Sequence, residues 1–286
     1  QDDWFDKISV NKNMKHLKIL LVLFLISSCA TNTSDPNLKL YVFDCGLIKF
    51  DDISFFGLSN EDTEVRELFV PCYIIEHDQG SLLWDAGLPL SFVGKGKIIT
   101  RPGVEQSYEI SLIEQMEKMN FKIDEIDFIA LSHLHSDHVG AATMFNEATW
   151  LVQEPEFEAA FSPSPMFDLS LYEGLKSNKR QILNGDFDVF GDGSVTILSA
   201  PGHTPGHQVL LLDLKAFGPL LLSGDLYHFV KSRELKSVPD FNVNAEETLE
   251  SMSKIENIIA TKKATLWIEH SLDLSQTIDL APAYYD

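Results

Sequence analysis

The chain has 286 residues, of which 44% are hydrophobic and 23% are charged, enough apolar sequence for one large globular domain without disulfide or metal staples. Its formal net charge is −21. This excess of acid argues against a nucleic-acid or other polyanion partner, which needs clustered Lys and Arg, and it disfavours a nuclease or phosphodiesterase.

The N-terminal segment has the pattern of an export signal. A basic start at residues 14–18 precedes the apolar run 19–26, which is too short to span a bilayer. The run ends in Ile-Ser-Ser-Cys, which resembles the lipobox of bacterial lipoproteins and predicts a lipid anchor at Cys29, with an ordinary secretory signal as the alternative. We expect an exported protein, periplasmic or membrane-anchored, with leader and signal at residues 1–29, a polar tether at 30–37 and a single domain at 38–286.

Two further cysteines lie in apolar, strand-like stretches of the chain. Export would permit a disulfide between Cys45 and Cys72. Because each is flanked by residues typical of a buried strand, two buried free thiols are at least as compatible with the sequence. The sequence leaves the pairing open.

From residue 38 onward, strand-like and helix-like patterns alternate. Helical periodicity is clearest at residues 107–120 and 244–261, and Asn244 is a suitable N-cap for the second helix. Another helix is expected to begin near residue 141. This order favours the α/β class, with the layers of an αββα sandwich. Strands are predicted at residues 39–45, 73–77, 81–85, 127–132, 150–153, 195–199, 208–214, 219–223 and 265–269.

Four potential metal ligands lie within six positions, directly after one of these strands. Residues 133–138 read His-Leu-His-Ser-Asp-His. On extended backbone His133 and His135 face the same way, so both imidazoles can reach one cation. Asp137 and His138 then turn toward a second position. The segment therefore predicts a two-metal hydrolase site.

Three later ligand candidates also follow predicted strands. They are His203 in a Pro-Gly-His-Thr-Pro-Gly-His segment, Asp225 after an apolar strand, and His270 after the last strand. Asp225 is predicted to bridge two cations, and His207 to orient its loop by hydrogen bonding. Imidazole with carboxylate is the ligand set of catalytic Zn²⁺, so two Zn²⁺ ions are expected.

Together these motifs resemble the metallo-β-lactamase superfamily over nearly all of residues 38–286, and within it the N-acyl-homoserine lactonase family. The closer likeness is carried by the segments 71–77, 80–87, 132–135 and 145–148. The resemblance implies an αββα four-layer sandwich of the metallo-β-lactamase type. It also implies a binuclear zinc hydrolase that opens the lactone ring of N-acyl-homoserine lactones, a quorum-quenching activity. One Zn²⁺ would be held by His133, His135 and His203, the other by Asp137, His138 and His270, with Asp225 and a hydroxide bridging them.

The expected chemistry is attack of that hydroxide on the lactone carbonyl, with Asp137 carrying a proton to the leaving oxygen. The lactonase family places a tyrosine three residues after the bridging aspartate, where its hydroxyl contacts the substrate carbonyl. This chain has His228 there and Tyr227 one residue earlier. Either His228 donates the hydrogen bond instead, or Tyr227 faces a wall and the site treats its substrate differently. The last ligand, His270, also departs from the family pattern, because it lies in Glu-His-Ser where the family has Gly-His-Asp.

An acyl tail needs an apolar groove, and two loop-like segments, 47–58 and 161–172, contain apolar side chains for one. Phe55, Phe56 and Met166 are the candidate contacts. Alternatively, and with equal weight, the apolar side chains of these segments close the core and do not contact a substrate.

Other activities would use the same metal site. An exported metallo-β-lactamase and a thioesterase are the alternatives, although Asp225 disfavours zinc β-lactamases that have a cysteine there. A non-catalytic binder on a hydrolase scaffold is disfavoured because the ligand set is intact. The expected partner is a small molecule, with membrane contact only through the lipid anchor. The native metal, the acyl-chain preference and the oligomeric state stay open.

Overall fold

The structure is a computed structural model, and it describes residues 37–286. The predicted leader and signal, Cys29 and all but the last residue of the predicted tether lie outside these residues. None of the helices from residue 37 onward combines the length and the apolar character that crossing a bilayer requires.

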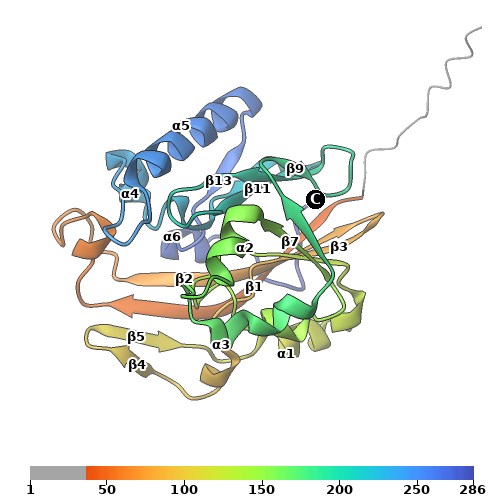
Figure 1. The fold of residues 1–286 in the computed structure, drawn as a ribbon, viewed down its shortest axis with the longest axis horizontal. Helices are drawn as coiled ribbons and strands as arrows, with labels where there is room; N and C mark the ends of the chain where they lie inside the picture. The colour runs from red at the N-terminus through yellow and green to blue at the C-terminus, as the bar shows by residue number, and fades with distance from the viewer. Residues whose placement is uncertain (1–36) are drawn as a thin grey trace, which may run out of the picture. The chain divides into compact units, whose positions relative to one another are not determined.

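Two β-sheets form the centre of the fold (Figure 1). The larger sheet has eight strands in the order β4-β5-β1-β2-β3-β6-β7-β8, and the smaller has five in the order β13-β12-β11-β10-β9. The larger sheet consists of β1 (Lys39–Phe50), β2 (Glu67–His77), β3 (Gly80–Trp84), β4 (Ile98–Arg101), β5 (Val104–Ser107), β6 (Phe128–Ala130), β7 (Thr149–Gln153) and β8 (Arg180–Leu183). The smaller consists of β9 (Phe187–Asp188), β10 (Val195–Ser199), β11 (Gln208–Leu214), β12 (Gly218–Leu222) and β13 (Thr265–Trp267).

Within residues 37–286, six α-helices accompany the sheets, together with short 3₁₀ turns. The long helix α5 lies over the smaller sheet, and α1 to α3 lie on the side of the larger sheet (Figure 1). The helices are α1 (Leu112–Lys118), α2 (Glu154–Ala160), α3 (Leu169–Tyr172), α4 (Val230–Leu235), α5 (Ala245–Lys262) and α6 (Leu272–Ser275). The 3₁₀ turns are η1 (Ser54–Phe56), η2 (Leu90–Phe92), η3 (Ile123–Glu125), η4 (Ala142–Met144), η5 (Glu173–Ser177) and η6 (Gly224–Leu226).

Within residues 37–286, three apolar cores lie between the layers of the fold. Successive side chains of β11 point alternately into two of these cores. Leu210 and Leu212 pack into the core between the two sheets, whereas Val209 and Leu211 point to the core beneath α5. Each fully buried leucine contributes about 1.5–3 kcal/mol to folding. A third core lies between the larger sheet and α1 to α3. The predicted αββα sandwich is therefore confirmed.

All nine predicted strands are present, two of them, β10 and β11, with the predicted bounds. The predicted helix 244–261 is α5, and the Oδ1 atom of Asn244 accepts the N–H of Glu247 at 3.1 Å, as expected of an N-cap.

Two helix predictions were wrong in extent. The helix predicted at 107–120 begins only at Leu112, because residues up to Ser107 form β5, whose backbone pairs with an extension of β1. The helix expected near residue 141 is only the 3₁₀ turn η4. Here the N–H groups of Gly140 and Ala141 donate to the carbonyls of Gly87 and Ala86, which holds the chain against the loop after β3.

The two segments predicted as loops are more ordered than expected. Residues 47–50 continue β1, and the turn η1 follows in the same segment. The segment 161–172 ends in the helix α3, capped by Asp168, whose carboxylate accepts the N–H of Ser170. Both segments still carry apolar side chains toward the region where the strand-end loops meet.

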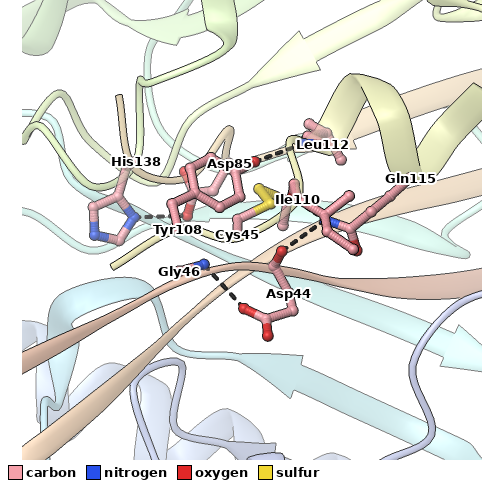
Figure 2. The surroundings of a disulfide bond; sticks show 10 residues. Asp44, Cys45, Gly46, Asp85, Tyr108, Ile110, Leu112, Gln115 and His138 are labelled. Atoms are coloured by element: carbon pink, nitrogen blue, oxygen red, sulfur yellow. Dashed lines mark hydrogen bonds and ion pairs between the residues drawn. A yellow bond between two sulfur atoms is a disulfide. The ribbon is translucent and has the colours of Figure 1, made fainter. Parts of the chain in front are cut away.

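A disulfide joins Cys45 of β1 to Cys72 of β2, with an S–S distance of 2.04 Å, so the free-thiol alternative is not what the structure contains. The register places Phe43 opposite Cys72, and Cys45, two residues further along β1, lies on the same face of the sheet. Figure 2 shows the bond close to the loop after β3 that carries Asp85. A side chain at Gly87 would collide with Cys45, so the disulfide packs directly against this loop.

Candidate metal centre

All seven predicted ligands meet where the strands of both sheets end. In the smaller sheet β12 runs parallel to β13. Because β10 and β12 are each antiparallel to β11, β10 runs in the same direction as β12 and β13. His203, Asp225 and His270 therefore leave the sheet at one edge. The loop after β6, which carries the other four ligands, faces them from the larger sheet.

The first group consists of His133, His135 and His203. The Nε2 atom of His133 lies 2.8 Å from Nδ1 of His135 and 3.1 Å from Nε2 of His203. The remaining distance, from Nε2 of His203 to Nδ1 of His135, is also 3.1 Å. Three imidazole nitrogens thus converge on one point.

The second group consists of Asp137, His138 and His270. The Oδ2 atom of Asp137 lies 3.7 Å from the Nε2 atoms of both histidines. Asp137, like His135, is partly exposed and borders the open side of the site.

Asp225 faces both groups with different oxygens. Its Oδ2 lies 3.5 Å from Nε2 of His133 and 3.3 Å from Nε2 of His203. Its Oδ1 lies 3.4 Å from Nε2 of His138 and 2.9 Å from Nε2 of His270. A carboxylate in this position can bridge two cations, as the sequence predicted.

Three buried atoms at the second group make no hydrogen bond to the described residues, although two of them lie close together. Oδ1 of Asp225 and the Nε2 atoms of His138 and His270 are buried without a hydrogen bond. Leaving buried polar atoms unsatisfied costs about 1–3 kcal/mol each, and metal ligation would remove that cost. Nitrogen and carboxylate donors in two adjacent groups therefore fit a pair of divalent cations, and Zn²⁺ suits this donor set.

The charge states in the first group suit metal binding. Burial lowers the pKa of His133, and it lowers the pKa of His135 to about 3, so both imidazoles are neutral near pH 7. Neutral imidazole is the ligand form. For Asp225, burial acts to raise the pKa, but the imidazoles around it, His228 and His270 foremost, hold it well below its usual range. The bridging side chain is therefore a carboxylate.

In the second group the nearby acids have the opposite effect. Burial lowers the pKa of His138. The carboxylates of Asp85 and Asp225 outweigh burial and raise this pKa well above its usual range. Against burial, Asp225 also raises the pKa of His270. Binding of a cation here must displace protons from these rings, so metal affinity should fall at low pH.

Hydrogen bonds on the outer side orient the ligand rings. Nδ1 of His138 lies 3.0 Å from Oδ2 of Asp85, so it donates to that carboxylate and leaves Nε2 for the metal (Figure 2). In the same way, Nδ1 of His203 donates to Asn242 at 2.8 Å, and Nδ1 of His270 donates to the carbonyl of Phe69 at 2.7 Å. Neither Asp85 nor Asn242 was predicted from the sequence to be a site residue.

His207 takes the orienting role predicted for it. Its Nδ1 donates to the carbonyl of Ala200 at 2.9 Å, and its Nε2 accepts the backbone N–H of Asp225 at 3.0 Å. Burial lowers the pKa of His207 to about 3, which keeps Nε2 available as an acceptor. The side chain therefore supports the bridging aspartate rather than binding metal itself.

Glu156 of α2 connects two ligand loops and was not found from the sequence. Its Oε1 accepts the N–H of Leu134 at 3.1 Å, and its Oε2 accepts the N–H of Gly206 at 2.8 Å. The first loop carries His133 and the second His203. The carboxyl group is buried, which raises its pKa to about 7. One side chain thus sets the spacing between the loops.

Replacing Glu156 with glutamine should lower both stability and metal affinity. The amide NH₂ would face one of the two backbone donors, and an unsatisfied buried donor costs about 1–3 kcal/mol. Urea denaturation and metal titration measure the two effects. Glu158→Gln, an exposed position on the same helix, is the control. Equal behaviour of the two variants would contradict this role for Glu156.

His228 and Tyr227 lie on opposite sides of the chain after η6. The Nε2 atom of His228 lies 3.0 Å from Oδ2 of Asp225, and its ring lines the cavity above the ligands. The hydroxyl of Tyr227 instead donates to Glu256 of α5 at 3.0 Å, away from the cavity lining. Only His228 is therefore positioned to reach a molecule bound at the ligands.

A cavity of about 850 Å³ opens above the ligands. Both Phe55 and Phe56 line it, as expected of tail contacts. Met166 does not: its side chain is half exposed, and the segment 161–172 reaches the cavity through Asp168 and Leu171 instead. The apolar wall consists of Ile48, Phe50, Phe55, Phe56, Leu68, Pro89, Phe92, Val104, Leu171 and Phe241.

Residues 65–258 match the family model described as the Metallo-beta-lactamase superfamily. An N-acyl homoserine lactonase of Rhizobium johnstonii is 30% identical to the chain, over 87% of this chain and 99% of that protein. An N-acyl homoserine lactonase of Bacillus thuringiensis subsp. kurstaki is 26% identical, over 86% and 98%.

A solved structure of an N-acyl homoserine lactone hydrolase is similar in fold. It is 25% identical in sequence and superimposes with a TM-score of 0.73, over 86% of this chain and 98% of that one. In that protein the product N-hexanoyl-L-homoserine is bound at the catalytic metal centre.

Proposed function

Because the chain belongs to the metallo-β-lactamase superfamily, we propose that it hydrolyses the lactone ring of N-acyl-homoserine lactones at a two-metal centre, a quorum-quenching activity. The observation that carries the proposal is Asp225, whose two oxygens face two separate ligand groups at the floor of an apolar cavity. The likeness to N-acyl homoserine lactonases over nearly their full length supports this substrate class.

In this proposal His133, His135 and His203 hold one Zn²⁺, and Asp137, His138 and His270 hold the other, with Asp225 between them. When bound, such a pair polarises a carbonyl oxygen and lowers the pKa of a bound water to about 7. The buried histidines exclude bulk water from this end of the cavity.

The other side chains of the cavity bind and orient the substrate. The wall containing Phe55 and Phe56 receives the acyl tail, while the lactone faces the floor. His228 projects beside Asp225 and donates a hydrogen bond to the substrate carbonyl, in the place where the lactonase family has a tyrosine. Preorganised donors at such a position stabilise the charge that develops on the oxygen.

Asp137 completes the reaction as the residue that moves a proton. Hydrolysis forms a bond between the water oxygen and the carbonyl carbon, and breaks the ring bond from that carbon to oxygen. The leaving oxygen must gain a proton to become a hydroxyl. Asp137 lines the cavity and is partly exposed, so it can pass the proton from the attacking water to that oxygen.

A substrate panel tests the proposed activity. The metal-loaded protein without residues 1–36 is followed in a pH-stat on N-acyl-homoserine lactones, simple lactones, a β-lactam and a thioester. We expect one equivalent of acid for each acyl-homoserine lactone consumed. Acid release from the β-lactam or the thioester alone would reject the proposal in favour of those activities.

We further propose that the protein is exported and anchored to a membrane through a lipid on Cys29, after removal of a lipoprotein-type signal. The signal and tether pattern of residues 14–37 supports this. The buried Cys45–Cys72 disulfide is consistent with it, since disulfides persist in oxidising compartments.

Replacing Cys29 with serine should move the protein from the membrane fraction to the soluble fraction of cells that process lipoproteins, because the lipid attachment atom is lost. Immunoblots of the two fractions measure the change. Cys29→Ser protein that stays with the membranes would show that something other than this lipid holds it there.

A further inference from the structure

The cavity leads away from the metal ligands along a file of aromatic rings. The Phe56 ring lies 4.8 Å from that of His228, and the Phe55 ring lies 4.4 Å from that of Phe56, centroid to centroid. Beyond Phe55 comes Arg101, whose guanidinium carbon lies 5.1 Å from the centre of the Phe55 ring. The file therefore connects the proposed reaction centre to a cation.

Arg101 is brought to this place by the hairpin of β4 and β5. Val104 of β5 pairs with Phe50 of β1, so the hairpin extends the larger sheet along the cavity wall. Thr100, Arg101 and Gln106 of this hairpin line the cavity. The far end of the cavity is thus polar, in contrast to the aromatic wall between it and the ligands.

Arg101 is the only lysine or arginine in the cavity lining. Among residues 37–286 its recorded contact is the Phe55 ring, and no ion pair within 4.0 Å includes it. Stacking on a ring leaves the N–H groups at the edge of the guanidinium plane free to donate. Arg101 is exposed to solvent, so its guanidinium, which has no acidic partner at the end of the substrate cavity, is free to bind an anionic ligand.

We propose that Arg101 is a subsite for a carboxylate at the far end of the acyl tail. The substrates it favours would be N-acyl-homoserine lactones whose acyl group derives from a dicarboxylic acid, an inference that depends on the proposed function. The planar fork of arginine matches a carboxylate through two parallel hydrogen bonds, and the aromatic file accommodates the methylene chain between the two ends.

Besides the metal ligands Asp137 and Asp225, two acids border the cavity and oppose an anion. Asp168 is exposed, and its Oδ1 already accepts the N–H and the hydroxyl of Ser170 at 3.1 and 2.6 Å. Asp240 is exposed, and its backbone N–H donates to the carbonyl of Phe55 at 2.9 Å. Water and salt screen exposed charges over about 8–10 Å, whereas a paired hydrogen bond to Arg101 acts at contact. An uncharged tail lying along Phe55 is the competing possibility, and the test separates the two.

The test compares two lactones of equal chain length, N-hexanoyl-homoserine lactone and N-adipoyl-homoserine lactone, which differ by a terminal carboxylate. We measure kcat and KM for both with the wild type and Arg101→Met, which keeps the length of the side chain. The variant should lose roughly 10- to 100-fold in kcat/KM on the adipoyl lactone, mostly through KM, the range for a hydrogen bond to a charged group. On the hexanoyl lactone, kcat/KM of Arg101→Met should differ from that of the wild type by less than about 2-fold.

Arg180→Met is the matched control. The Arg180 guanidinium also lies over a phenylalanine, 4.8 Å from the ring of Phe157, but it does not line the cavity. Arg180→Met should leave kcat/KM unchanged on both lactones. If Arg101→Met affects both lactones equally, or neither, the subsite is refuted while hexanoyl hydrolysis still supports the proposed function. If the wild type hydrolyses neither lactone, the proposed function itself is refuted, and the subsite with it.

Discussion

Replacing Asp225 with alanine will abolish lactone hydrolysis and leave the protein with fewer than two bound metal ions. The two carboxylate oxygens of Asp225 lie 2.9–3.5 Å from four histidine nitrogens, two in each ligand group. Without them the two cations lose their common ligand. Metal ions contribute several kcal/mol to stabilising the transition state, so kcat/KM should fall by at least about 10³-fold.

The metal content and kcat/KM of Asp225→Ala are measured on protein loaded under the same conditions as the wild type. Asp213→Ala is the control, because Asp213 is an exposed aspartate of the neighbouring strand β11. It should keep both metals and full activity. If Asp225→Ala binds two ions and keeps more than about a tenth of the activity, the bridging role is refuted.

Replacing His228 with phenylalanine should reduce kcat/KM by about 10²- to 10³-fold while leaving the metal content unchanged. This is the loss that follows removal of one preorganised donor at a developing oxyanion. The ring is held in place by packing, 4.8 Å from Phe56 and 5.7 Å from Phe241 between centroids. Phenylalanine has a slightly larger aromatic ring and leaves no cavity, so the effect reports the lost ring nitrogens.

The variants Tyr227→Phe and His228→Tyr test which of the two residues, Tyr227 or His228, donates the hydrogen bond to the substrate carbonyl. The Tyr227 hydroxyl donates to Glu256, which also pairs with Arg233 at 2.6 Å, so its removal should lower the unfolding free energy by about 1 kcal/mol with little change in kcat. His228→Tyr should retain part of the activity, because a phenol is also a donor. A larger kcat loss in Tyr227→Phe than in His228→Phe would assign the role to Tyr227.

The ligand set could be predicted because it follows one rule. Each ligand lies in the loop that follows an apolar run typical of a buried strand, and parallel strands end at the same edge of a sheet. That rule identifies His203, Asp225 and His270 from sequence alone. Asp85 also follows a buried strand, so the same rule could have found it as the partner of His138.

Other parts of the site depend on contacts that no local pattern encodes. Glu156 is an acidic residue in a helix rich in glutamate, and only the approach of the Leu134 and Gly206 backbones distinguishes it from exposed Glu158. Met166 has the apolar character of a tail contact, yet its side chain faces solvent. Burial of one residue in a loop is decided by the rest of the fold.

The fold departs from prediction where pairing partners are distant in sequence. Only the last residue of β5, Ser107, was predicted to belong to a helix, and its pairing with Leu47 of β1 joins residues more than fifty positions apart. The cysteines could not be paired for the same reason: Cys45 and Cys72 lie 27 residues apart, and only the register of β1 with β2 brings them together.

The most direct test of the two-metal lactonase is to restore the metal-free protein with Zn²⁺ in steps and to follow N-hexanoyl-homoserine lactone hydrolysis in the pH-stat at each step. We expect no activity without metal, and a rise that stops at two ions per chain, because both ligand groups must be filled. Full activity without metal, or no lactone hydrolysis by protein that holds two ions, would contradict it.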